Sequence, residues 1–361
     1  MKNIKIFVAL FIIVSIFTAC SKPEVKNEGM PAEKNQTQEK TEAKEEMKEE
    51  KKEEPKQEAK AEMPTEKLTF VLDWVPNTNH TGLFVAKDNG YFAEENLEVE
   101  IIQPAEDSSA TIVGLGKAEF GISFQPNMVK RLKKDVPITA VAAVLQHNTA
   151  GIMSLKEKGI ATPKDMPGKK YSTWEDPIDD ATIQAIVEKD GGDWSKVEFI
   201  SGEFTDATTA LRLNLFDSIF VYQGWDKIHA DIQKVETNFF LLTDYMPEFD
   251  YYSPVIIANN DFLANKPEVA RRVLRAIKKG YEFAAEKPAE AAEILIKNAP
   301  EGNTELIRAS QEYVSTQYIA DAKSWGVIDR NRWNAFYKWL YEKQLVEMSL
   351  EDKGFSTDYL E

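Results

Sequence analysis

The sequence predicts an α/β protein in which two lobes, joined by two strands, enclose a ligand cleft. Strand-like and helix-like stretches alternate from residue 68 onward, a pattern typical of mostly parallel sheets with helices on both faces. One α/β unit interrupts another, and the chain crosses between them near residues 146–155 and 250–258. A polar, aromatic loop, residues 73–82, follows the first strand, at the edge where open α/β sheets bind ligands.

The first lobe is predicted from residues 66–150 and 256–361. Apolar stretches rich in β-branched residues indicate its strands, which we expect at Leu68–Leu72, Leu97–Gln103, Gly121–Phe124 and Ile138–Leu145. Two short helices are expected between these strands. One opens at residues 83–87 and is stopped by Gly90; the other covers residues 110–114, with Ser109 as its cap.

The second lobe is predicted from residues 151–255. Its strands are expected at Ile152–Leu155, Lys169–Ser172, Val197–Ser201, Ser218–Tyr222 and Phe239–Thr243. Its helices are expected at Asp179–Glu188, which Gly191 and Gly192 end, and at Asp206–Arg212.

A strand at Tyr252–Ala258 then returns the chain to the first lobe. Helical patterns follow at Pro267–Ala284, Pro288–Lys297, Thr304–Tyr318 and Arg330–Lys343. The prolines that open the first two fit the first turn of a helix. Two lobes joined by two strands form a hinged clamp; two α/β domains without a clamp are the alternative.

The first 19 residues are predicted to be a lipoprotein signal peptide. Lys2 and Lys5 precede an apolar run from Ile6 to Phe17, which is too short for a comfortable membrane span. Small residues then lead to Cys20, the only cysteine of the chain. We expect Cys20 to be lipidated and to anchor the protein to the cell membrane on its extracytoplasmic side. The alternative is a plain signal peptide with an incidental cysteine.

Residues 20–65 are expected to be a disordered tether. They consist mainly of Lys, Glu, Gln, Ala and Pro, with almost no large apolar side chain to offset chain entropy. Their mixed charge favours a solvated spacer over a nucleic-acid arm. The net charge of −16 for the whole chain also argues against a nucleic-acid partner.

Residues suited to catalysis are scarce. The chain has three histidines, His80, His147 and His229, and no P-loop, HExxH or GxSxG motif. No His, Cys, Asp and Glu residues cluster at metal-ligand spacing. We therefore expect no enzymatic activity, no metal and no other cofactor.

Aromatic residues instead fall on loops that follow strands. Trp74, Phe124, Trp174 and Tyr222 each stand at or just after the end of an expected strand, and Tyr251 precedes the returning strand. Stacking of a flat ring between such side chains is favourable, and neighbouring carboxylates and amides can orient its amino groups and ring nitrogens. The alternative is that these are ordinary core aromatics.

The histidines have simpler alternatives. His80 either binds a ligand or caps the helix that follows it, while His147 is expected to brace the crossing and His229 to lie on the surface. Aromatic residues at helical spacing near the C-terminus are expected to pack the last helices: Trp325, Trp333, Phe336, Tyr337, Trp339 and Tyr341.

Seven motifs give the chain a family resemblance that covers nearly all of residues 66–361. They are residues 73–82, 85–92, 121–125, 146–149, 189–193, 222–225 and 250–256, including Gln146-His147-Asn148-Thr149 and Tyr222-Gln223-Gly224-Trp225. This set resembles the binding proteins for thiamine pyrimidine precursors. The resemblance implies the type II periplasmic-binding-protein fold and a monomer that delivers an aminopyrimidine, such as formylaminopyrimidine, to the permease of an ABC importer.

The resemblance also implies which residues line the cleft. Asp73, Trp74, Asn77 and His80 would form the wall of the first lobe, and Trp174, Glu175, Tyr222 and Trp225 the wall of the second. Gln125 and Tyr251 are added as further candidate ligand contacts.

The same superfamily holds an enzyme branch that makes the pyrimidine from its own histidine, with iron and a Cys-rich motif. This chain departs from that branch, because residues 124–127 read Phe-Gln-Pro-Asn where the donor histidine is expected and residues 249–255 contain no cysteine. We expect a binding protein. Riboflavin, thiamine, a sulfonate or a nitrile-type molecule remain alternative ligands, and a sensor or adhesin an alternative role.

Overall fold

The computed structural model describes residues 64–104, 107–173, 175–202 and 206–360. The predicted signal peptide, Cys20, Trp174 and the predicted tether up to residue 63 lie outside this part of the chain. Across the described ranges, no helix combines the length and apolar character that a membrane span requires.

The first sheet contains β1 (Glu66–Val71), β2 (Leu97–Ile102), β3 (Phe120–Ser123), β4 (Ile138–Ala143) and β10 (Val255–Asn259). Their spatial order is β2-β1-β3-β10-β4. β1 runs parallel to β2 and β3, whereas β10 runs antiparallel to β3 and β4. β10 reaches the sheet from the second crossing and therefore enters it in the opposite direction.

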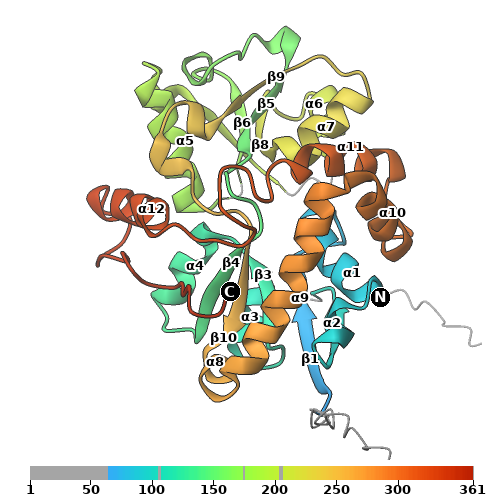
Figure 1. Ribbon diagram of the computed structural model, residues 1–361. Coiled ribbons are helices and arrows are strands. Elements are labelled where there is room, and N and C mark those ends of the chain that lie inside the picture. Colours follow the sequence, from blue (N-terminus) through green and yellow to red (C-terminus); the bar gives the residue numbers. More distant parts are fainter. Residues whose placement is uncertain (1–63, 105–106, 174, 203–205, 361) are drawn as a thin grey trace, which may run out of the picture. The chain divides into compact units, whose positions relative to one another are not determined.

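The second sheet contains β5 (Ala150–Leu155), β6 (Lys170–Thr173), β7 (Glu198–Ser201), β8 (Ser218–Tyr222) and β9 (Thr237–Leu241). Their order is β7-β6-β8-β5-β9, with β5 antiparallel to β8 and β9 (Figure 1). In each sheet four strands share one direction, as the prediction of mostly parallel sheets implies, and only the strand that follows a crossing, β10 or β5, runs against its neighbours. Both sheets are mixed.

The chain passes between the two sheets twice. The first crossing, residues 144–149, joins β4 to β5, and the second, residues 242–254, joins β9 to β10. The second crossing contains two short 3-10 helices, η6 (Leu242–Asp244) and η7 (Pro247–Phe249). Two α/β lobes joined by two crossings are the arrangement that the predicted type II periplasmic-binding-protein fold requires.

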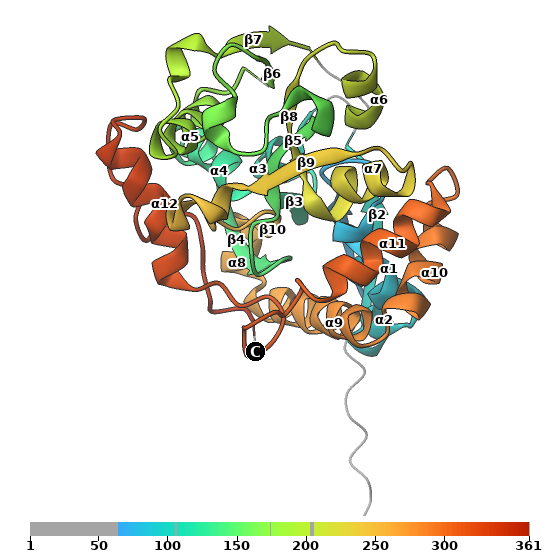
Figure 2. The same ribbon diagram turned by 90° about the horizontal axis from the view of Figure 1, so that it is seen from above.

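Helices of the first lobe come from both ends of the described chain. The early ones are η1 (Thr78–His80), α1 (Thr81–Asp88), α2 (Tyr91–Glu94), α3 (Ser109–Gly114) and α4 (Gln125–Leu132). The late ones are α8 (Asn260–Asn265), α9 (Pro267–Glu286), α10 (Pro288–Asn298), α11 (Thr304–Ser315) and α12 (Arg330–Glu342). Figures 1 and 2 show α1 beside α9 and α10, so segments about 200 residues apart form one layer.

The second lobe carries α5 (Pro177–Lys189), α6 (Ala207–Arg212) and α7 (Ile228–Ile232), with short 3-10 helices η2 (Lys156–Lys158), η3 (Pro163–Asp165) and η4 (Trp194–Lys196). A single π-helical turn, η5 (Gln223–Lys227), separates β8 from α7. Such turns are rare and occur frequently at functional sites. This one follows directly on Tyr222, a predicted site residue.

Local sequence signals located most helix ends. Pro267 and Pro288 lie in the first turns of α9 and α10, as predicted, and Gly90 adopts φ 78° just after α1. The cap of α3 is Ser108, not Ser109, because the Ser108 side chain accepts a hydrogen bond from the Thr111 N–H. Helix α4 was not predicted, although Pro126 marks its first turn.

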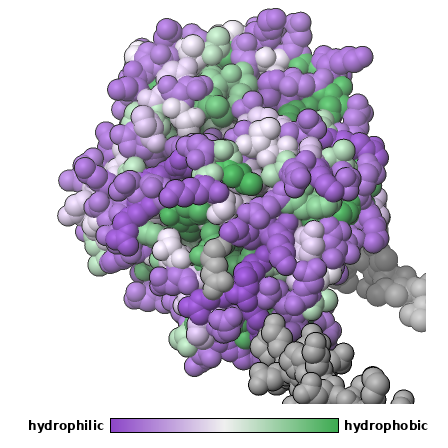
Figure 3. Space-filling model, viewed as in Figure 1, coloured by the Kyte–Doolittle hydropathy of each residue, from purple (hydrophilic) through white to green (hydrophobic). Residues whose placement is uncertain are grey.

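The C-terminal aromatic residues pack as predicted. Trp325, Trp333, Phe336, Tyr337 and Trp339 are buried, and only Tyr341 is exposed. They belong to two large clusters of buried side chains, one of which also includes Tyr251 and Tyr252 of the second crossing. On the face drawn in Figure 3, hydrophilic side chains predominate and apolar ones form separate patches.

Candidate functional site

The candidate site lies where both lobes meet the two crossings. The first lobe contributes the loop after β1 and the end of β3, and the second contributes the start of α5 and the end of β8. The second crossing contributes Tyr251 and Ser253. Ligand sites of open α/β sheets lie at these strand ends.

A hydrogen-bonded network fixes the loop after β1. The Asn77 N–H donates to Nδ1 of His80 over 3.2 Å, so Nε2 carries the ring proton and donates to Oδ1 of Asp73 over 2.7 Å. The Asn77 side chain also accepts from the Asn79 N–H. His80 is fully buried and completes a capping box with Asn77 at η1. His80 stands at the N-cap position of α1 but its side chain makes no cap hydrogen bond there, so it serves η1 and not, as predicted, the helix that follows it. A ligand contact by His80 stays a prediction.

Two tyrosines donate hydrogen bonds to the backbone of the same loop. The Tyr281 hydroxyl donates to the Asn79 carbonyl and the Tyr318 hydroxyl to the Thr78 carbonyl, each over 2.6 Å. Tyr281 and Tyr318 are fully buried and contact each other edge to face. Hydrogen bonds to both backbone and side chains therefore fix the loop that carries the Asp73 carboxylate.

Tyr222, at the end of β8, forms an aromatic wall with the first lobe. Its ring stacks on Phe124 with centroids 6.4 Å apart, and its hydroxyl lies 3.3 Å from the Ser253 hydroxyl. Burial raises the pKa of Tyr222, and the carboxylates of Asp179 and Asp73 raise it further. The Tyr222 hydroxyl is thus influenced by carboxylates from both lobes.

The start of α5 places three aspartates beside this wall. Asp176 accepts from the Ile178 N–H and from Lys130, and Asp180 accepts from the Thr173 hydroxyl. Within the described part of the chain, no group donates a hydrogen bond to the half-buried Asp179. Burial, followed by the charges of Asp176 and Asp180, raises the pKa of Asp179 to about 7, although Lys130 opposes the shift.

The two lobes are in contact on either side of the site. Lys130 of α4 forms an ion pair with Asp176 over 2.6 Å. On the other side, the Tyr313 hydroxyl of α11 donates to the Gln223 side chain over 3.1 Å, and the Ser310 hydroxyl donates to the Gly224 carbonyl. A Cβ at Gly224 would lie 2.9 Å from a methyl group of Val314, so this contact requires glycine.

The structure brings together only some of the predicted site residues. Hydrogen bonds join Asp73, Asn77 and His80 in the loop after β1. Tyr222 stacks on Phe124, and Tyr251 is buried against Phe336 with its hydroxyl near Asn148.

Four other predicted ligand residues are not joined to these by any contact described above. Trp225 packs against the core of the first lobe, and Trp74 is 48% exposed. Gln125 is fully buried, donates to the Trp333 carbonyl and accepts from the Tyr252 N–H. Glu175 is exposed and has φ 56°, an uncommon conformation for a residue with a side chain. Ligand contacts by these four residues stay predictions.

His147 joins the two crossings, the bracing role expected for it. Its Nδ1 lies 2.8 Å from Asp250 and its Nε2 3.1 Å from Asp321. Arg332 also reaches Asp250, over 3.4 Å, and lies over the ring of Tyr252. His229, expected on the surface, is partly exposed on α7.

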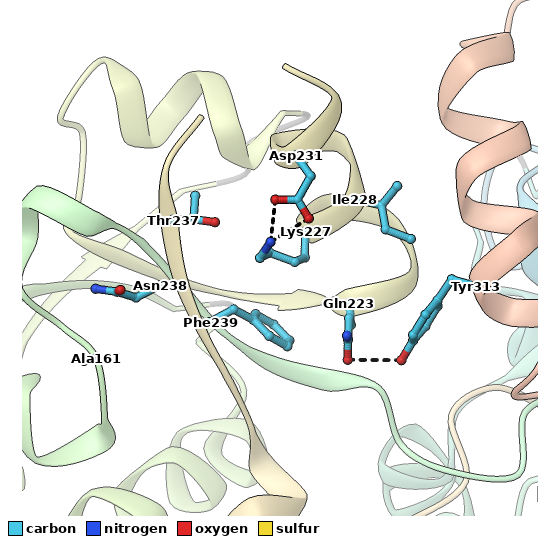
Figure 4. Close-up of a pocket in the computed structure, with 9 residues that line it drawn as sticks. All are labelled: Ala161, Gln223, Lys227, Ile228, Asp231, Thr237, Asn238, Phe239 and Tyr313. Carbon is cyan, nitrogen blue, oxygen red and sulfur yellow. Dashed lines mark hydrogen bonds and ion pairs between the residues drawn. The ribbon is translucent and has the colours of Figure 1, made fainter. Parts of the chain in front are cut away.

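A separate pocket of about 410 Å³ lies beside η5 (Figure 4). Its lining comes from η5, α7, β9, α11 and the loop at residue 161: Ala161, Gln223, Lys227, Ile228, Asp231, Thr237, Asn238, Phe239 and Tyr313. The Lys227–Asp231 ion pair and the Gln223–Tyr313 hydrogen bond occupy much of its polar lining. None of the predicted ligand residues lines this pocket. In the described ranges no group of three or more His, Cys, Asp and Glu side chains is arranged to hold a metal.

Asp179 and Lys130 are the site residues that sequence reasoning missed. Asp179 was assigned only to the start of a helix. The usable signal was the Asp176-Pro177-x-Asp179-Asp180 stretch directly after a strand, because it puts carboxylates in the first turn of a helix at the ligand-binding edge.

The fold is that of the periplasmic binding proteins. The backbone is similar to that of the alkanesulfonate-binding protein SsuA from Xanthomonas axonopodis pv. citri bound to MOPS, with a TM-score of 0.63 and 10% identity over 81% of this chain and 99% of that chain. At this identity the likeness concerns the fold alone.

The chain belongs to the NMT1/THI5 like family, whose model matches residues 77–291. It is 29% identical to the formylaminopyrimidine-binding protein of Halalkalibacterium halodurans, over 76% of this chain and 84% of that protein. It is 26% identical to the 4-amino-5-hydroxymethyl-2-methylpyrimidine phosphate synthase THI13 of Saccharomyces cerevisiae, over 67% of this chain and 74% of that protein. The predicted family resemblance is confirmed.

Proposed function

We propose that this protein is the extracytoplasmic substrate-binding component of an ABC importer and captures a thiamine pyrimidine precursor, an aminopyrimidine such as formylaminopyrimidine. The observation that carries the proposal is the position of Tyr222, which ends β8 beside β6, the strand that leads into the aspartates of α5, and whose ring stacks on Phe124 with centroids 6.4 Å apart. An aminopyrimidine combines a flat ring, which stacks on tyrosine, with an exocyclic amine that donates to carboxylates.

The charge around the site supports this class of ligand. Asp73, Asp176, Asp179 and Asp180 lie around it, and Lys130 is the cation paired with one of them. A carboxylate wall disfavours an anionic ligand such as a sulfonate, because like charges repel most strongly where water is excluded. The same wall favours thiamine, which carries a cation, and makes thiamine the second candidate for the same transport role.

Capture would proceed by closure of the two lobes, which we propose to comprise residues 66–150 with 256–361, and residues 151–255. The ion pair between Lys130 and Asp176 and the contacts of α11 with Gln223 and Gly224 connect the lobes. Ligand contacts made from both lobes would shift the population toward the closed form, which would then dock on the permease. We propose that the protein acts as a monomer.

Binding rather than synthesis is supported by the residues after β3. Residues 124–127, where the enzyme branch is expected to have its donor histidine, contain none, and both polar atoms of the Gln125 side chain are engaged inside the protein. The family includes a protein named for formylaminopyrimidine binding as well as proteins named as synthases. Measurement of iron bound to the purified protein, together with mass spectrometry for a pyrimidine product, tests the enzymatic alternative.

Isothermal titration tests the ligand. Purified protein is titrated with formylaminopyrimidine and, separately, with 4-amino-5-hydroxymethyl-2-methylpyrimidine, thiamine and riboflavin. Sub-micromolar affinity for an aminopyrimidine alone is the expected result. Tight binding of thiamine or riboflavin alone would replace the ligand and keep the transport role, and failure to bind any of the four would refute the proposed ligand class.

The proposed membrane anchor has its own test. If Cys20 is lipidated, the Cys20→Ser protein should leave the membrane fraction of the producing bacterium, while the unchanged chain should stay in that fraction and carry a lipid mass at its new N-terminus. Equal fractionation of both proteins would refute lipid anchoring through Cys20.

A further inference from the structure

Asp179 differs from its two acidic neighbours in having no hydrogen-bond donor among the described residues. Asp176 is satisfied by Ile178 and Lys130, and Asp180 by Thr173. Carboxylates that burial shields from water normally have hydrogen-bond partners, so the lack of a donor among the described residues calls for an explanation. Its position beside Tyr222, in the cleft that we propose to hold an aminopyrimidine, suggests that the ligand supplies the partner.

We propose that Asp179 and a ring nitrogen of the bound aminopyrimidine share one proton taken up from solvent, so that the site selects pyrimidines whose ring nitrogen is basic. This inference rests on the proposed function and adds a rule of selectivity to it. In the complex, one proton bridges the carboxylate oxygen and the ring nitrogen, either as a carboxylic acid that donates to nitrogen or as a pyrimidinium that donates to the carboxylate. No covalent bond between heavy atoms is made or broken.

The groups around Asp179 make proton uptake favourable. On its own helix it faces the carboxylates of Asp176 and Asp180, and from α4 it faces Lys130, whose ammonium is committed to Asp176. The tyrosines Tyr171, Tyr222 and Tyr251 face it from β6, β8 and the second crossing, and their pKa values are raised, so they stay neutral. The ionised form of Asp179 would therefore add a negative charge beside Asp176 and Asp180 that Lys130 compensates poorly.

Closure of the lobes on a flat ligand would remove more water from this carboxylate. Loss of solvent penalises the ionised form and favours a shared proton. The pKa of Asp179 in the free protein is already raised to about 7 by burial, and the ring nitrogens of aminopyrimidines are weak bases that titrate near neutrality. At pH 8, both groups are mostly unprotonated before binding, so the complex must take up close to one proton.

Linkage then fixes the pH dependence of binding. Affinity should rise as the pH falls from 8.5 toward 6.5, with a slope that approaches tenfold per pH unit at the alkaline end. Below that range both partners are protonated before they meet, so that one proton must leave and the affinity should level off or fall. A ligand with a less basic ring should bind more weakly at every pH in the range.

Titration calorimetry at pH 8 in buffers of different ionisation enthalpy measures the uptake directly. The probe is 4-amino-5-hydroxymethyl-2-methylpyrimidine, titrated in phosphate and in Tris. For the unchanged protein we expect the slope of the observed enthalpy against buffer ionisation enthalpy to correspond to nearly one proton. Asp179→Asn should abolish the uptake, whereas the matched control Glu188→Gln, which neutralises an exposed carboxylate near the other end of the same helix, should keep it.

A second measurement needs no variant. The unchanged protein is titrated with 4-amino-2-methylpyrimidine and with its 5-fluoro derivative, whose ring nitrogens are less basic but whose shape is nearly the same. We expect the fluoro compound to bind at least several-fold more weakly at pH 8.

Binding of the probe without proton uptake, undiminished uptake in Asp179→Asn, or equal affinity for the two analogues would overturn the proton-sharing inference and leave the proposed function intact. Absence of binding of any aminopyrimidine between pH 6 and pH 9 would instead refute the proposed function.

Discussion

Substitution of Gly280 by alanine should damage both the fold and the site. Gly280 lies on α9 where that helix crosses α1, and a Cβ at this position would lie 2.0 Å from the Gly82 carbonyl oxygen and 3.1 Å from the Ala86 nitrogen. Ordinary contact begins at 3.4 Å, and the obstructing atoms are backbone. The two helices must therefore move apart, because no side chain can rotate out of the way.

The size of the effect follows from this geometry. Overpacking a closely packed region costs roughly 1–3 kcal/mol, and backbone obstruction places Gly280→Ala near the upper end, at about 3 kcal/mol. For a folded unit of this size we expect a fall in Tm of roughly 6–12 °C. Because α1 begins at Thr81, directly after His80, its displacement should also move the Asp73–His80 wall and lower ligand affinity.

Urea unfolding followed by circular dichroism measures the stability, and titration calorimetry the affinity. The matched control is Gly90→Ala, at a glycine with φ 78° and open space around it, where strain alone should cost about 1–2 kcal/mol. We expect Gly280→Ala to be the less stable variant and Gly90→Ala to bind ligand normally. Equal stability of the two variants would refute the close approach of α1 and α9.

Three further predictions concern the site. Tyr222→Ala should weaken binding of an aminopyrimidine tenfold or more in titration calorimetry, whereas Tyr222→Phe keeps the ring and should stay within a few-fold of the unchanged protein; equal affinities would remove stacking from the explanation. His80→Ala leaves the Asp73 carboxylate and the Asn77 N–H without a partner and should cost roughly 2–4 kcal/mol in urea unfolding, so an unchanged midpoint would contradict a structural role. Because the pKa of Asp179 is raised from 3.8 to about 7, the folded state binds the extra proton and this group's contribution to stability declines as the pH rises from about 4 through 7. Asp179→Asn should therefore gain stability relative to the unchanged protein between pH 5 and pH 8, and a constant difference would count against the shift.

The sequence predicted most of the secondary structure because local signals determine it. Alternation of apolar strands with capped helices located both sheets, and Gly90, Pro267 and Pro288 marked helix ends where the structure has them. The reversed direction of β5 and β10 was not predictable in this way. It depends on where each crossing delivers the chain, which is a property of the whole topology.

The site was predictable only where its contacts are local. The hydrogen bonds of His80 to Asp73 and Asn77 lie within eight residues of chain, and a polar sequence after a strand indicated this loop. Gln125 looked like a ligand contact for the same reason, yet its partners are Trp333 and Tyr252, which are distant in sequence. Trp225 likewise packs against a large buried cluster, beside a close approach of Gly224 to α11 that no local pattern reveals.

The two walls of the site differ in how far they are prepared for a ligand. In the first lobe, His80 already orients the Asp73 carboxylate, and buried tyrosines hold the backbone of its loop. In the second, Asp179 stands half-buried without a donor among the described residues. A preorganised wall binds at a low entropic cost, whereas an unpaired carboxylate gains most when a donor arrives together with closure. The asymmetry therefore favours an order of events in which the ligand first settles against Asp73 and the second lobe then closes to give Asp179 its partner.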